Sequence, residues 1–330
     1  MGKRKYDGFQ VGKILGDKKE SVKYGGVWEM TSGIPKLEIL IGLPGSGKST
    51  YAKKEHKSNS NSVYLSSDKI RGELYGNESV QGNPAEVFTL MQSRAIEALK
   101  NGRDVFYDAT NLTRKDRAGI LTATPRYVYK QATMVFTPYE MCIERDAARE
   151  RSVGKEVIDR MIRRFQPPFY DEGFDFIDVY KNYSNEEYEQ FMNKYGSLFD
   201  RMMILHDNPH HSLPVWEHCQ EAEKYVKDHF FFLEDRLKYK LASAARLHDC
   251  GKYIVKDFHD SKGNPSEHAH YYQHQCASAW QCMEETFNEF VIWLVGTHMD
   301  PFLDTKHYRN LDPWMKEAVD ILHEADLAAH

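Results

Sequence analysis

The chain has 330 residues, of which 41% are hydrophobic and 28% are charged, and its formal net charge at pH 7 is −5. This length is typical of two domains, and this composition indicates a folded soluble protein rather than a disordered one. The longest apolar run, Phe290–Val295, is far shorter than the about 20 residues that cross a bilayer. We therefore expect no membrane partner and a cytoplasmic location. The negative charge argues against a protein that coats nucleic acid, but it allows a local groove that holds a few phosphates.

The pattern along the chain predicts two domains with different chemistry. Residues 1–33 are interpreted as a basic leader without an assigned role. Over residues 34–182 short apolar runs alternate with helical patterns, which predicts an α/β domain with a parallel sheet flanked by helices. Residues 183–196 are expected to be a linker, and residues 197–330 an all-α domain. Of fifteen histidines only His56 precedes residue 206, and a His-rich module often binds metal.

Each predicted element follows from its apolar spacing and from the Gly and Pro residues that bound it. The predicted strands are Leu37–Ile41, Val63–Leu65, Asp104–Tyr107, Thr133–Phe136 and Phe174–Tyr180. Helices are predicted from Ser49 onward and over Asp68–Tyr75, Ala85–Lys100, Tyr139–Arg151 and Glu156–Phe165. In the second half we expect successive helices joined by polar loops, one of which is Asp260–Ser266.

A phosphate-binding motif lies between the first predicted strand and the first predicted helix. Residues 42–50 read Gly-Leu-Pro-Gly-Ser-Gly-Lys-Ser-Thr and fit the pattern G-x-x-x-x-G-K-[ST]. Backbone N–H groups of such a loop surround the β-phosphate, Lys48 neutralises phosphate oxygens, and Ser49 helps to hold Mg²⁺. We therefore predict a site for ATP or another nucleoside triphosphate with Mg²⁺. The predicted nucleotide-binding residues are Gly42, Pro44, Gly45, Ser46, Gly47, Lys48, Ser49 and Thr50.

Candidate residues for phosphoryl transfer follow the next strands. Asp68 could accept a proton from an attacking hydroxyl, and Arg71, one helical turn on, could hold a neighbouring phosphate. The alternative is a helix N-cap with a surface arginine. Asp108 ends another strand, where it supports either Mg²⁺ or the acceptor site, or simply caps a turn. Arg145 and Arg149 share a face of the predicted helix and are expected to close over the γ-phosphate, with a solvated charged face as the alternative.

Over about residues 36–180 these motifs resemble, in order and spacing, the kinase domain of phage-type polynucleotide 5′-kinases. The matching segments are Gly42–Thr50, Ser67-Asp68-x-x-Arg71, Asp108-x-Thr-Asn111 and Arg145-x-x-x-Arg149. The resemblance implies transfer of a γ-phosphate to a 5′-hydroxyl end, with Asp68 as general base and Arg71 on the acceptor's 3′ phosphate. It also implies that Arg145 and Arg149 lie over the donor phosphates. The phage enzymes have Asp-Thr-Asn in place of Asp108-Ala-Thr-Asn111, and their phosphatase signature Asp-x-Asp-Gly-Thr is absent here.

Metal-binding residue types gather in the second half. His248-Asp249 ends an Ala/Leu-rich helix, His218 lies near the start of another, and Asp326 lies in the last predicted helix. Imidazoles combined with carboxylates favour Mn²⁺, Fe²⁺, Co²⁺, Ni²⁺ or Mg²⁺ over a thiolate-type zinc site. An ion of this kind activates water and neutralises phosphoryl oxygens. The alternative is a set of histidines that hydrogen-bond within helical packing.

The order His218…His248-Asp249…Asp326 resembles the HD-domain phosphohydrolases. His274 and His298 stand in segments similar to the extra histidines of HD modules with two metals, especially those attached to tRNA nucleotidyltransferases. The resemblance implies one or two divalent transition metals, a role for Asp249 in catalysis as well as in binding, and 2′,3′-cyclic phosphate or 2′-phosphate ends as substrates. His268 and His270 are interpreted as spare ligands or substrate contacts. The histidines left as surface or helix-entry residues are His206, His210 and His211.

Together the two centres predict a bifunctional enzyme that heals RNA ends. It would phosphorylate 5′-hydroxyl ends and remove 2′,3′-cyclic, 2′- or 3′-phosphates, with RNA or DNA ends as partners and a separate RNA ligase acting downstream. A homo-oligomer is a further expectation, taken from related kinases. One alternative is a nucleoside or nucleotide kinase fused to an HD nucleotidase. Another is a nucleotide-dependent sensor whose HD module binds a ligand without hydrolysing it.

Overall fold

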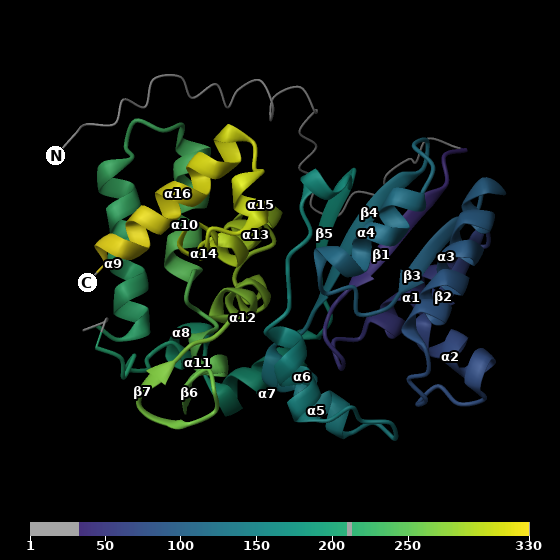
Figure 1. The fold of residues 1–330 in the computed structure, drawn as a ribbon, viewed down its shortest axis with the longest axis horizontal. Coiled ribbons are helices and arrows are strands. Elements are labelled where there is room, and N and C mark those ends of the chain that lie inside the picture. The colour runs from purple at the N-terminus through teal and green to yellow at the C-terminus, as the bar shows by residue number, and fades with distance from the viewer. Residues whose placement is uncertain (1–32, 210–212, 330) are drawn as a thin grey trace.

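The computed structural model describes residues 33–209 and 213–329. Residues 1–32 of the predicted leader, together with His210 and His211, lie outside the described residues. A parallel sheet with its helices lies on one side, and a mostly helical region lies on the other (Figure 1). This arrangement confirms the predicted fold class, in which an α/β domain is followed by a helical one.

The sheet of the first domain has five parallel strands in the order β2-β3-β1-β4-β5. Their bounds are β1 Lys36–Ile41, β2 Ser62–Ser66, β3 Asp104–Asp108, β4 Tyr129–Phe136 and β5 Phe176–Lys181. Because the strands are parallel, their carboxyl ends meet at one edge of the sheet, where ligands bind in folds of this kind. The phosphate loop follows β1, Asp68 follows β2 and Asp108 ends β3, so the topology brings the predicted kinase residues to this edge.

Six helices accompany the sheet: α1 Lys48–Ser58, α2 Ser67–Tyr75, α3 Pro84–Lys100, α4 Arg114–Ala123, α5 Tyr139–Ala147 and α6 Lys155–Ile162. The predicted helix Tyr139–Arg151 is wrong at its end, because α5 stops at Ala147. The reason is Asp146, whose carboxylate accepts hydrogen bonds from the backbone N–H groups of Val153 and Gly154 and so turns the chain back. Helix α4 was not predicted, although Thr113 caps it with a local signal, a capping box.

The second domain is mostly helical. After α7 Asn185–Tyr195, which connects the domains, its helices are α8 Leu198–Arg201, α9 Val215–His229, α10 Asp235–Leu247, α11 Lys252–Val255, α12 His274–Gln281, α13 Glu289–Thr297, α14 Asp300–Leu303, α15 Lys306–Arg309 and α16 Pro313–Ala328. The stretch predicted as a linker thus contains α7. A hairpin of β6 Asp257–His259 and β7 Pro265–His270 interrupts the helices, and the expected loop Asp260–Ser266 supplies its turn. No helix within the described ranges is both long and apolar enough to cross a membrane.

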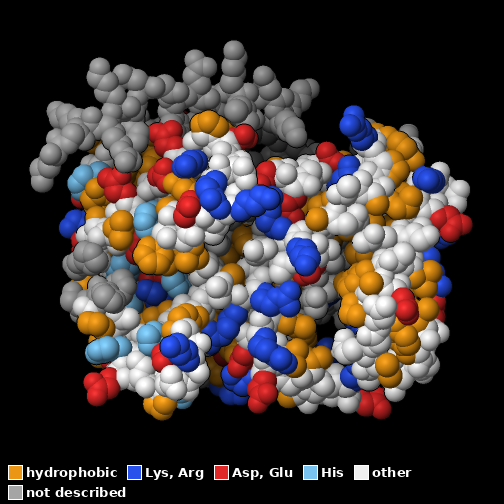
Figure 2. Space-filling view, in the orientation of Figure 1, with side chains coloured by type: hydrophobic (Ala, Val, Ile, Leu, Met, Phe, Trp, Pro, Cys, Tyr) orange, Lys and Arg blue, Asp and Glu red, His pale blue; other side chains and the backbone are white. Residues whose placement is uncertain are grey.

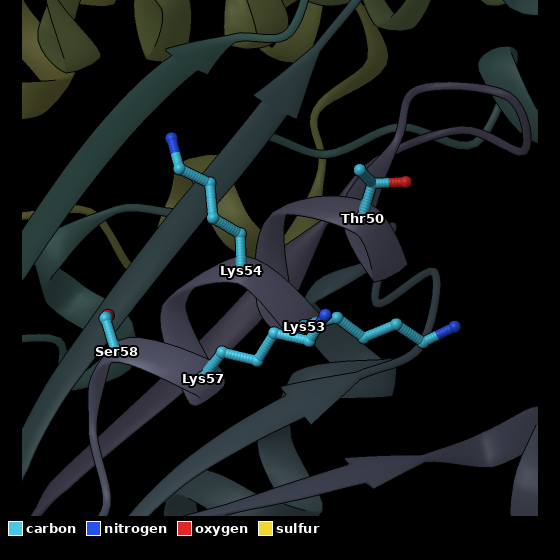
Figure 3. A pocket seen from close by; sticks show the side chains of 5 residues that line it. All are labelled: Thr50, Lys53, Lys54, Lys57 and Ser58. Carbon is cyan, nitrogen blue, oxygen red and sulfur yellow. The ribbon is translucent and has the colours of Figure 1, made fainter.

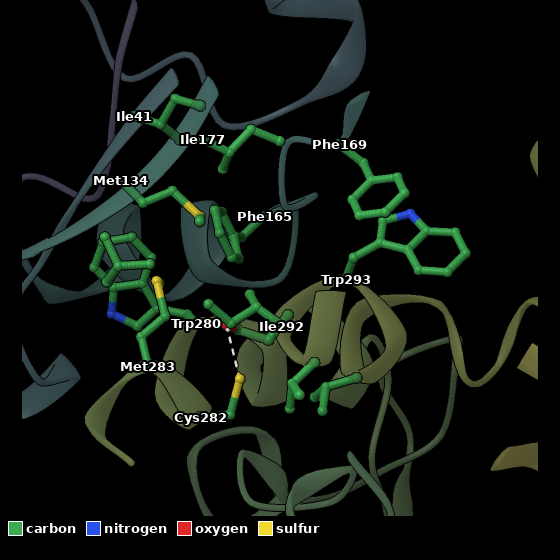
Figure 4. Packing of buried hydrophobic residues seen from close by; sticks show 14 of the residues in the cluster. Ile41, Met134, Phe165, Phe169, Ile177, Trp280, Cys282, Met283, Ile292 and Trp293 are labelled. Carbon is green, nitrogen blue, oxygen red and sulfur yellow. Dashed lines mark hydrogen bonds between the residues drawn. The ribbon is translucent and has the colours of Figure 1, made fainter. Parts of the chain in front are cut away.

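The two domains share one hydrophobic core. Trp280, on α12 of the second domain, is fully buried and lies against Phe136 and Phe165 of the first, with ring centroids 5.5 and 5.3 Å apart. Its indole Nε1 donates to the carbonyl oxygen of Thr137 (3.2 Å). Figure 4 shows Trp280 and Phe165 together with side chains from both domains. The domains are therefore packed against each other over an apolar surface, not joined only by a tether.

A buried ionic cluster crosses the same junction. The guanidinium of Arg201, on α8, donates to both carboxylate oxygens of Glu284 (2.6 and 2.7 Å) and to Glu140 of α5 (3.2 Å). It also donates to the hydroxyl of Tyr253 on α11 (3.1 Å). Removing one partner would leave a buried charge uncompensated, which is strongly unfavourable. The cluster therefore fixes the orientation of α5 relative to the helical domain.

Candidate functional site

The loop after β1 has the geometry of a phosphate cradle. Gly45 and Gly47 have φ values of 81° and 89°, in the left-handed region that favours glycine. A Cβ on Gly45 would lie 2.2 Å from the carbonyl oxygen of Cys142, and one on Gly47 would lie 1.8 Å from Nδ2 of Asn182. The backbone can take this path only with glycine at both positions. It places the loop at the N-terminus of α1, where the helix dipole favours an anion.

Lys48 is buried at the base of this loop. Its Nζ donates to the carbonyl oxygen of Leu43 (2.8 Å). Burial lowers the pKa of Lys48, although the nearby charge of Asp108 acts in the opposite direction. A desolvated ammonium group gains strongly from an anionic partner, and this is the role that the sequence assigns to Lys48 toward phosphate oxygens.

Asp108 lies beside Ser49 at the end of β3. Its Oδ2 accepts hydrogen bonds from the hydroxyl of Ser49 (2.7 Å) and from that of Tyr64 (2.6 Å). Burial, and then the charge of Asp108, raise the pKa of Tyr64, so the phenol stays protonated as a donor. A hydroxyl and a carboxylate in contact at the start of α1 are the oxygen ligands that Mg²⁺ prefers. The geometry therefore favours the metal-supporting interpretation of Asp108 over a capped turn.

Asp68 lies in the first turn of α2, where it is half exposed and forms an ion pair with Arg71. A second arginine, Arg151, approaches the other carboxylate oxygen at 3.7 Å. Arg151 is the last residue of the helix predicted over Tyr139–Arg151, and no role was predicted for it. The turn at Asp146 that shortens α5 also brings this arginine back toward Asp68. An accessible carboxylate between two guanidinium groups can face an acceptor that carries both a hydroxyl and a phosphate.

The two predicted lid arginines are separated by the end of α5. Arg145 donates to the carbonyl oxygen of Asn182 (2.8 Å) and contacts Glu187 of α7 (3.0 Å), so it supports the back of the phosphate loop. Arg149 lies beyond the helix, and its charge contributes to lowering the pKa of Lys48. The expectation that the pair shares a helical face is therefore wrong. Arg149 is an exposed cation near the loop, with Nη1 3.6 Å from Oδ1 of Asp146.

The six predicted metal ligands meet in the helical domain. His218 lies on α9, His248 and Asp249 follow α10, His274 begins α12, His298 follows α13 and Asp326 lies on α16. Each of the four imidazoles is hydrogen-bonded through Nδ1 to a backbone carbonyl oxygen, on Ala329, Ala245, Tyr271 and Val295 respectively. These bonds assign the proton to Nδ1 and direct the Nε2 lone pairs inward, as in metal-binding histidines.

The Nε2 atoms form two close pairs. His218 and His248 are 3.1 Å apart at these atoms, and His274 and His298 are 3.0 Å apart. Two nitrogens bound at right angles to one ion, with bonds of about 2.1 Å, lie about 3.0 Å apart, whereas a tetrahedral angle separates them by about 3.4 Å. Both separations are short enough for each pair to bind one ion, and the mixture of imidazoles and carboxylates suits Mn²⁺, Fe²⁺, Co²⁺ or Ni²⁺.

Asp249 joins the two pairs into one cluster. Its Oδ2 lies 3.3 Å from Nε2 of His248, and its Oδ1 lies 3.2 Å from Nε2 of His274. Asp326 completes the first group, with Oδ1 3.0 Å from Nε2 of His218. One group is thus His218, His248, Asp249 and Asp326, and the other is Asp249, His274 and His298. A carboxylate with one oxygen toward each group can bridge two ions.

The electrostatics of the cluster suit cation binding. Burial alone would raise the pKa of Asp249, but the charge of Lys252 beside it holds the pKa well below its ordinary range. Burial, and then His274 and His248, lower the pKa of His298 to about 3. The cluster therefore offers an ionised carboxylate and a neutral imidazole in a buried space.

Two residues beside the cluster were missed in the sequence. Lys252 places Nζ 2.6 Å from Oδ2 of Asp249, and it stands only three residues further along the chain. His206 is buried, not a surface residue, and its Nε2 lies 3.1 Å from the same Nζ. Burial, and then the charge of Lys252, lower the pKa of His206 to about 4. Within the described residues the cluster includes neither His268 nor His270, which lie on β7 of the hairpin.

A separate surface hollow of about 620 Å³ runs along α1 (Figure 3). It is lined by Thr50, Lys53, Lys54, Lys57 and Ser58. Of the predicted nucleotide-binding residues only Thr50 lines it, so the hollow lies beside the phosphate loop. On the face shown in Figure 2, Lys and Arg side chains gather over the middle of the molecule, where the domains meet. The acidic protein thus presents a locally positive surface there.

Comparison with known proteins agrees with the fold of the first domain. Residues 37–168 match the family model AAA_33, described as an AAA domain. The chain is 26% identical over 167 residues to the transcription factor bHLH140 of Arabidopsis thaliana, covering 48% of this chain and 17% of that protein. It is 26% identical over 166 residues to the L-seryl-tRNA(Sec) kinase of Methanococcus maripaludis, covering 48% of this chain and 64% of that protein. The chain therefore spans less than two thirds of either relative.

Among solved structures, a chain of the Pnkp1/Rnl/Hen1 complex is similar, with 28% identity and a TM-score of 0.33. The match covers 39% of this chain and 45% of that one. The family match, the parallel sheet and the phosphate loop together show that the first domain has the fold of P-loop kinases.

Proposed function

We propose that the protein heals broken RNA ends. The first domain phosphorylates a 5′-hydroxyl end from ATP or another nucleoside triphosphate, and the second removes a 2′,3′-cyclic phosphate or a 2′- or 3′-phosphate. The decisive observation is that a phosphate loop and a two-part His/Asp cluster occur in one chain with one continuous core. Many ribonucleases leave a 5′-hydroxyl and a 2′,3′-cyclic phosphate together. One enzyme with both sites would prepare both ends for a separate ligase.

The kinase step uses the residues at the sheet edge. The phosphate loop and Lys48 bind the donor phosphates, and Ser49 with Asp108 would hold Mg²⁺. The oxygen of the 5′-hydroxyl bonds to the γ-phosphorus, and Asp68 accepts the proton of that hydroxyl. The bond from the γ-phosphorus to the oxygen of the leaving ADP breaks at the same time. Arg149 supplies positive charge to the transferred group.

Recognition of a polynucleotide acceptor rests on the groups around Asp68. Arg71 and Arg151 approach its carboxylate from two sides and suit the phosphate next to the accepting hydroxyl. The relative from Methanococcus maripaludis is named as a kinase of L-seryl-tRNA(Sec), so a hydroxyl carried on RNA is the acceptor in that protein's name. The local positive surface over the domain junction supports a polyanionic substrate in a protein with a net charge of −5.

The hydrolytic step uses the histidine cluster. Bound divalent ions would activate water and neutralise phosphoryl oxygens. The first group of ligands would hold one ion and the second group another, with Asp249 shared between them. Lys252 keeps the shared carboxylate ionised and adds a positive charge beside it.

We assign residues 34–182 to the kinase domain, 183–196 to the connection and 197–330 to an HD-type phosphohydrolase domain. No role is assigned to residues 1–33. The enzyme would act in the cytoplasm, and we expect a homo-oligomer.

One oligonucleotide tests both activities. An RNA with a 5′-hydroxyl and a 2′,3′-cyclic phosphate is incubated with the protein, Mg²⁺-ATP and Mn²⁺ or Ni²⁺, and the products are weighed by mass spectrometry. We expect the mass of one phosphoryl group to be gained at the 5′ end and the cyclic phosphate to be opened or lost. Asp68→Asn should abolish only the first change and Asp249→Asn only the second. Phosphorylation of free nucleosides in preference to the oligonucleotide would overturn the assignment of RNA ends.

A further inference from the structure

One arginine of the kinase domain reaches into the loop that leads to the metal cluster. Arg163, which caps the C-terminal end of α6, is half-buried. Its Nη1 donates to the carbonyl oxygen of Tyr272 (2.8 Å), and its Nη2 donates to that of Val255 (3.4 Å). These two carbonyls lie at the end of α11 and just before α12. A single guanidinium therefore holds together the two chain segments that flank the β6–β7 hairpin.

The segment held by Arg163 ends in a metal-ligand histidine. Gln273 lies between Tyr272 and His274 and has φ 62°, an unfavourable conformation for a residue other than glycine. The carbonyl oxygen of Tyr271 accepts the bond from Nδ1 of His274 (2.9 Å). Of two consecutive carbonyls, one therefore orients the imidazole and the other is held by the arginine. A turn of this kind persists only when its surroundings hold it.

The position of His274 decides the geometry of the second ligand group. Its Nε2 lies 3.0 Å from that of His298 and 3.2 Å from Oδ1 of Asp249. His298 follows α13 and Asp249 follows α10, so both come from helices of the same domain. Among the described ligands of this group, only His274 follows a turn that is hydrogen-bonded to the kinase domain.

We propose that Arg163 is a positioning residue for the second metal site. It keeps the turn at Gln273 closed, so that His274 can share an ion with His298 and Asp249. The first group, which also includes Asp326, has no ligand on this loop and keeps its ion without Arg163. This inference rests on the proposed metal-dependent function of the cluster. It means that the hydrolytic centre is completed by a residue of the kinase domain.

The test measures binding of Mn²⁺ to the full chain by calorimetric titration and by electron paramagnetic resonance. The wild type should bind two Mn²⁺ ions and give the signal of an exchange-coupled pair. Arg163→Ala should weaken one of the two sites by about tenfold, the lower end of the range for outer-shell partners of metal ligands, and leave the signal of an isolated ion. Arg163→Lys, which can still donate to Tyr272, should recover part of the second site.

Matched variants separate this effect from general destabilisation. Arg164→Ala removes the exposed neighbouring arginine and should bind both ions as the wild type does. His274→Ala should reproduce the loss of the second ion. If Arg163→Ala binds two ions with wild-type affinity, or loses both sites equally, Arg163 does not position the second site. Binding of one ion by the wild type would overturn this inference and leave a one-metal hydrolase. If the wild type binds none, both this inference and the proposed hydrolytic function fail.

Discussion

Trp280 offers the sharpest test of the shared core. Its side chain is fully buried against Phe136 and Phe165, and replacement of such a ring by alanine typically costs about 3–5 kcal/mol. Loss of the hydrogen bond to Thr137 adds about 1 kcal/mol. We expect Trp280→Ala to lower the free energy of unfolding by about 4–6 kcal/mol. Trp280→Phe, which fills most of the space, should lower it by about 1–2 kcal/mol.

Urea unfolding followed by circular dichroism measures the change, and native-state hydrogen exchange locates it. Protection should fall together in the strands of the sheet and in α12 and α13, because the ring belongs to one core. Trp314→Ala on α16 is the control, since that side chain is only half-buried and its loss should cost less. A cost for Trp280→Ala below about 1 kcal/mol, or a loss of protection confined to the helical domain, would refute the idea of a common core.

Three further outcomes follow from the described geometry. Burial opposes the charged form of His307, but the nearby carboxylates of Asp171 (3.4 Å) and Asp300 (3.1 Å) outweigh it and raise its pKa. Protonated His307 therefore stabilises the folded state fully below the pKa that it has in the unfolded chain, and this stabilisation is lost as the pH rises through its higher pKa in the folded protein. His307→Gln should lower Tm at pH 5.5 and have little effect on Tm at pH 9. Gly47→Ala should weaken ATP binding at least tenfold in a titration, because its Cβ would overlap Asn182, whereas Gly102→Ala, also at positive φ but with open space, should bind ATP normally. Removal of divalent ions with a chelator should lower Tm, and Mn²⁺ at a hundred times its Kd should restore about 2.7 kcal/mol, provided that it binds only the folded state; an unchanged Tm would argue against a metal centre.

The parts of the structure that the sequence predicts well are those with local signals. The phosphate loop can be predicted from the spacing of Gly42, Gly47 and Lys48. The strands can be predicted from their short apolar runs, which do not depend on which strand pairs with them. His218, His248, Asp249 and Asp326 were found from their residue types and order, whereas His274 and His298 were added from the resemblance to HD modules with two metals. Lys252 had a local signal as well, three residues after Asp249, and could have been included.

The parts that were missed depend on contacts between distant residues. Nothing in the helical pattern of residues 139–151 shows that Asp146 will bind the backbone of Val153 and Gly154, so the end of α5 and the separation of Arg145 from Arg149 were not foreseen. His206 looked like a surface residue because its burial is created by other segments, including the one that carries Lys252. Composition and spacing carry no information on such pairings.

The shared core has a consequence for synthesis on the ribosome. Phe165 and Phe169 leave the ribosome roughly 120 residues before their partners Trp280 and Trp293. At about 5–20 residues per second, this leaves about 6–25 s during which one wall of the core faces water. The nascent first domain therefore carries an uncovered aromatic surface that a chaperone could bind. A stop codon or a long pause before α12 would leave an aggregation-prone fragment, even though every residue of its phosphate loop is already present.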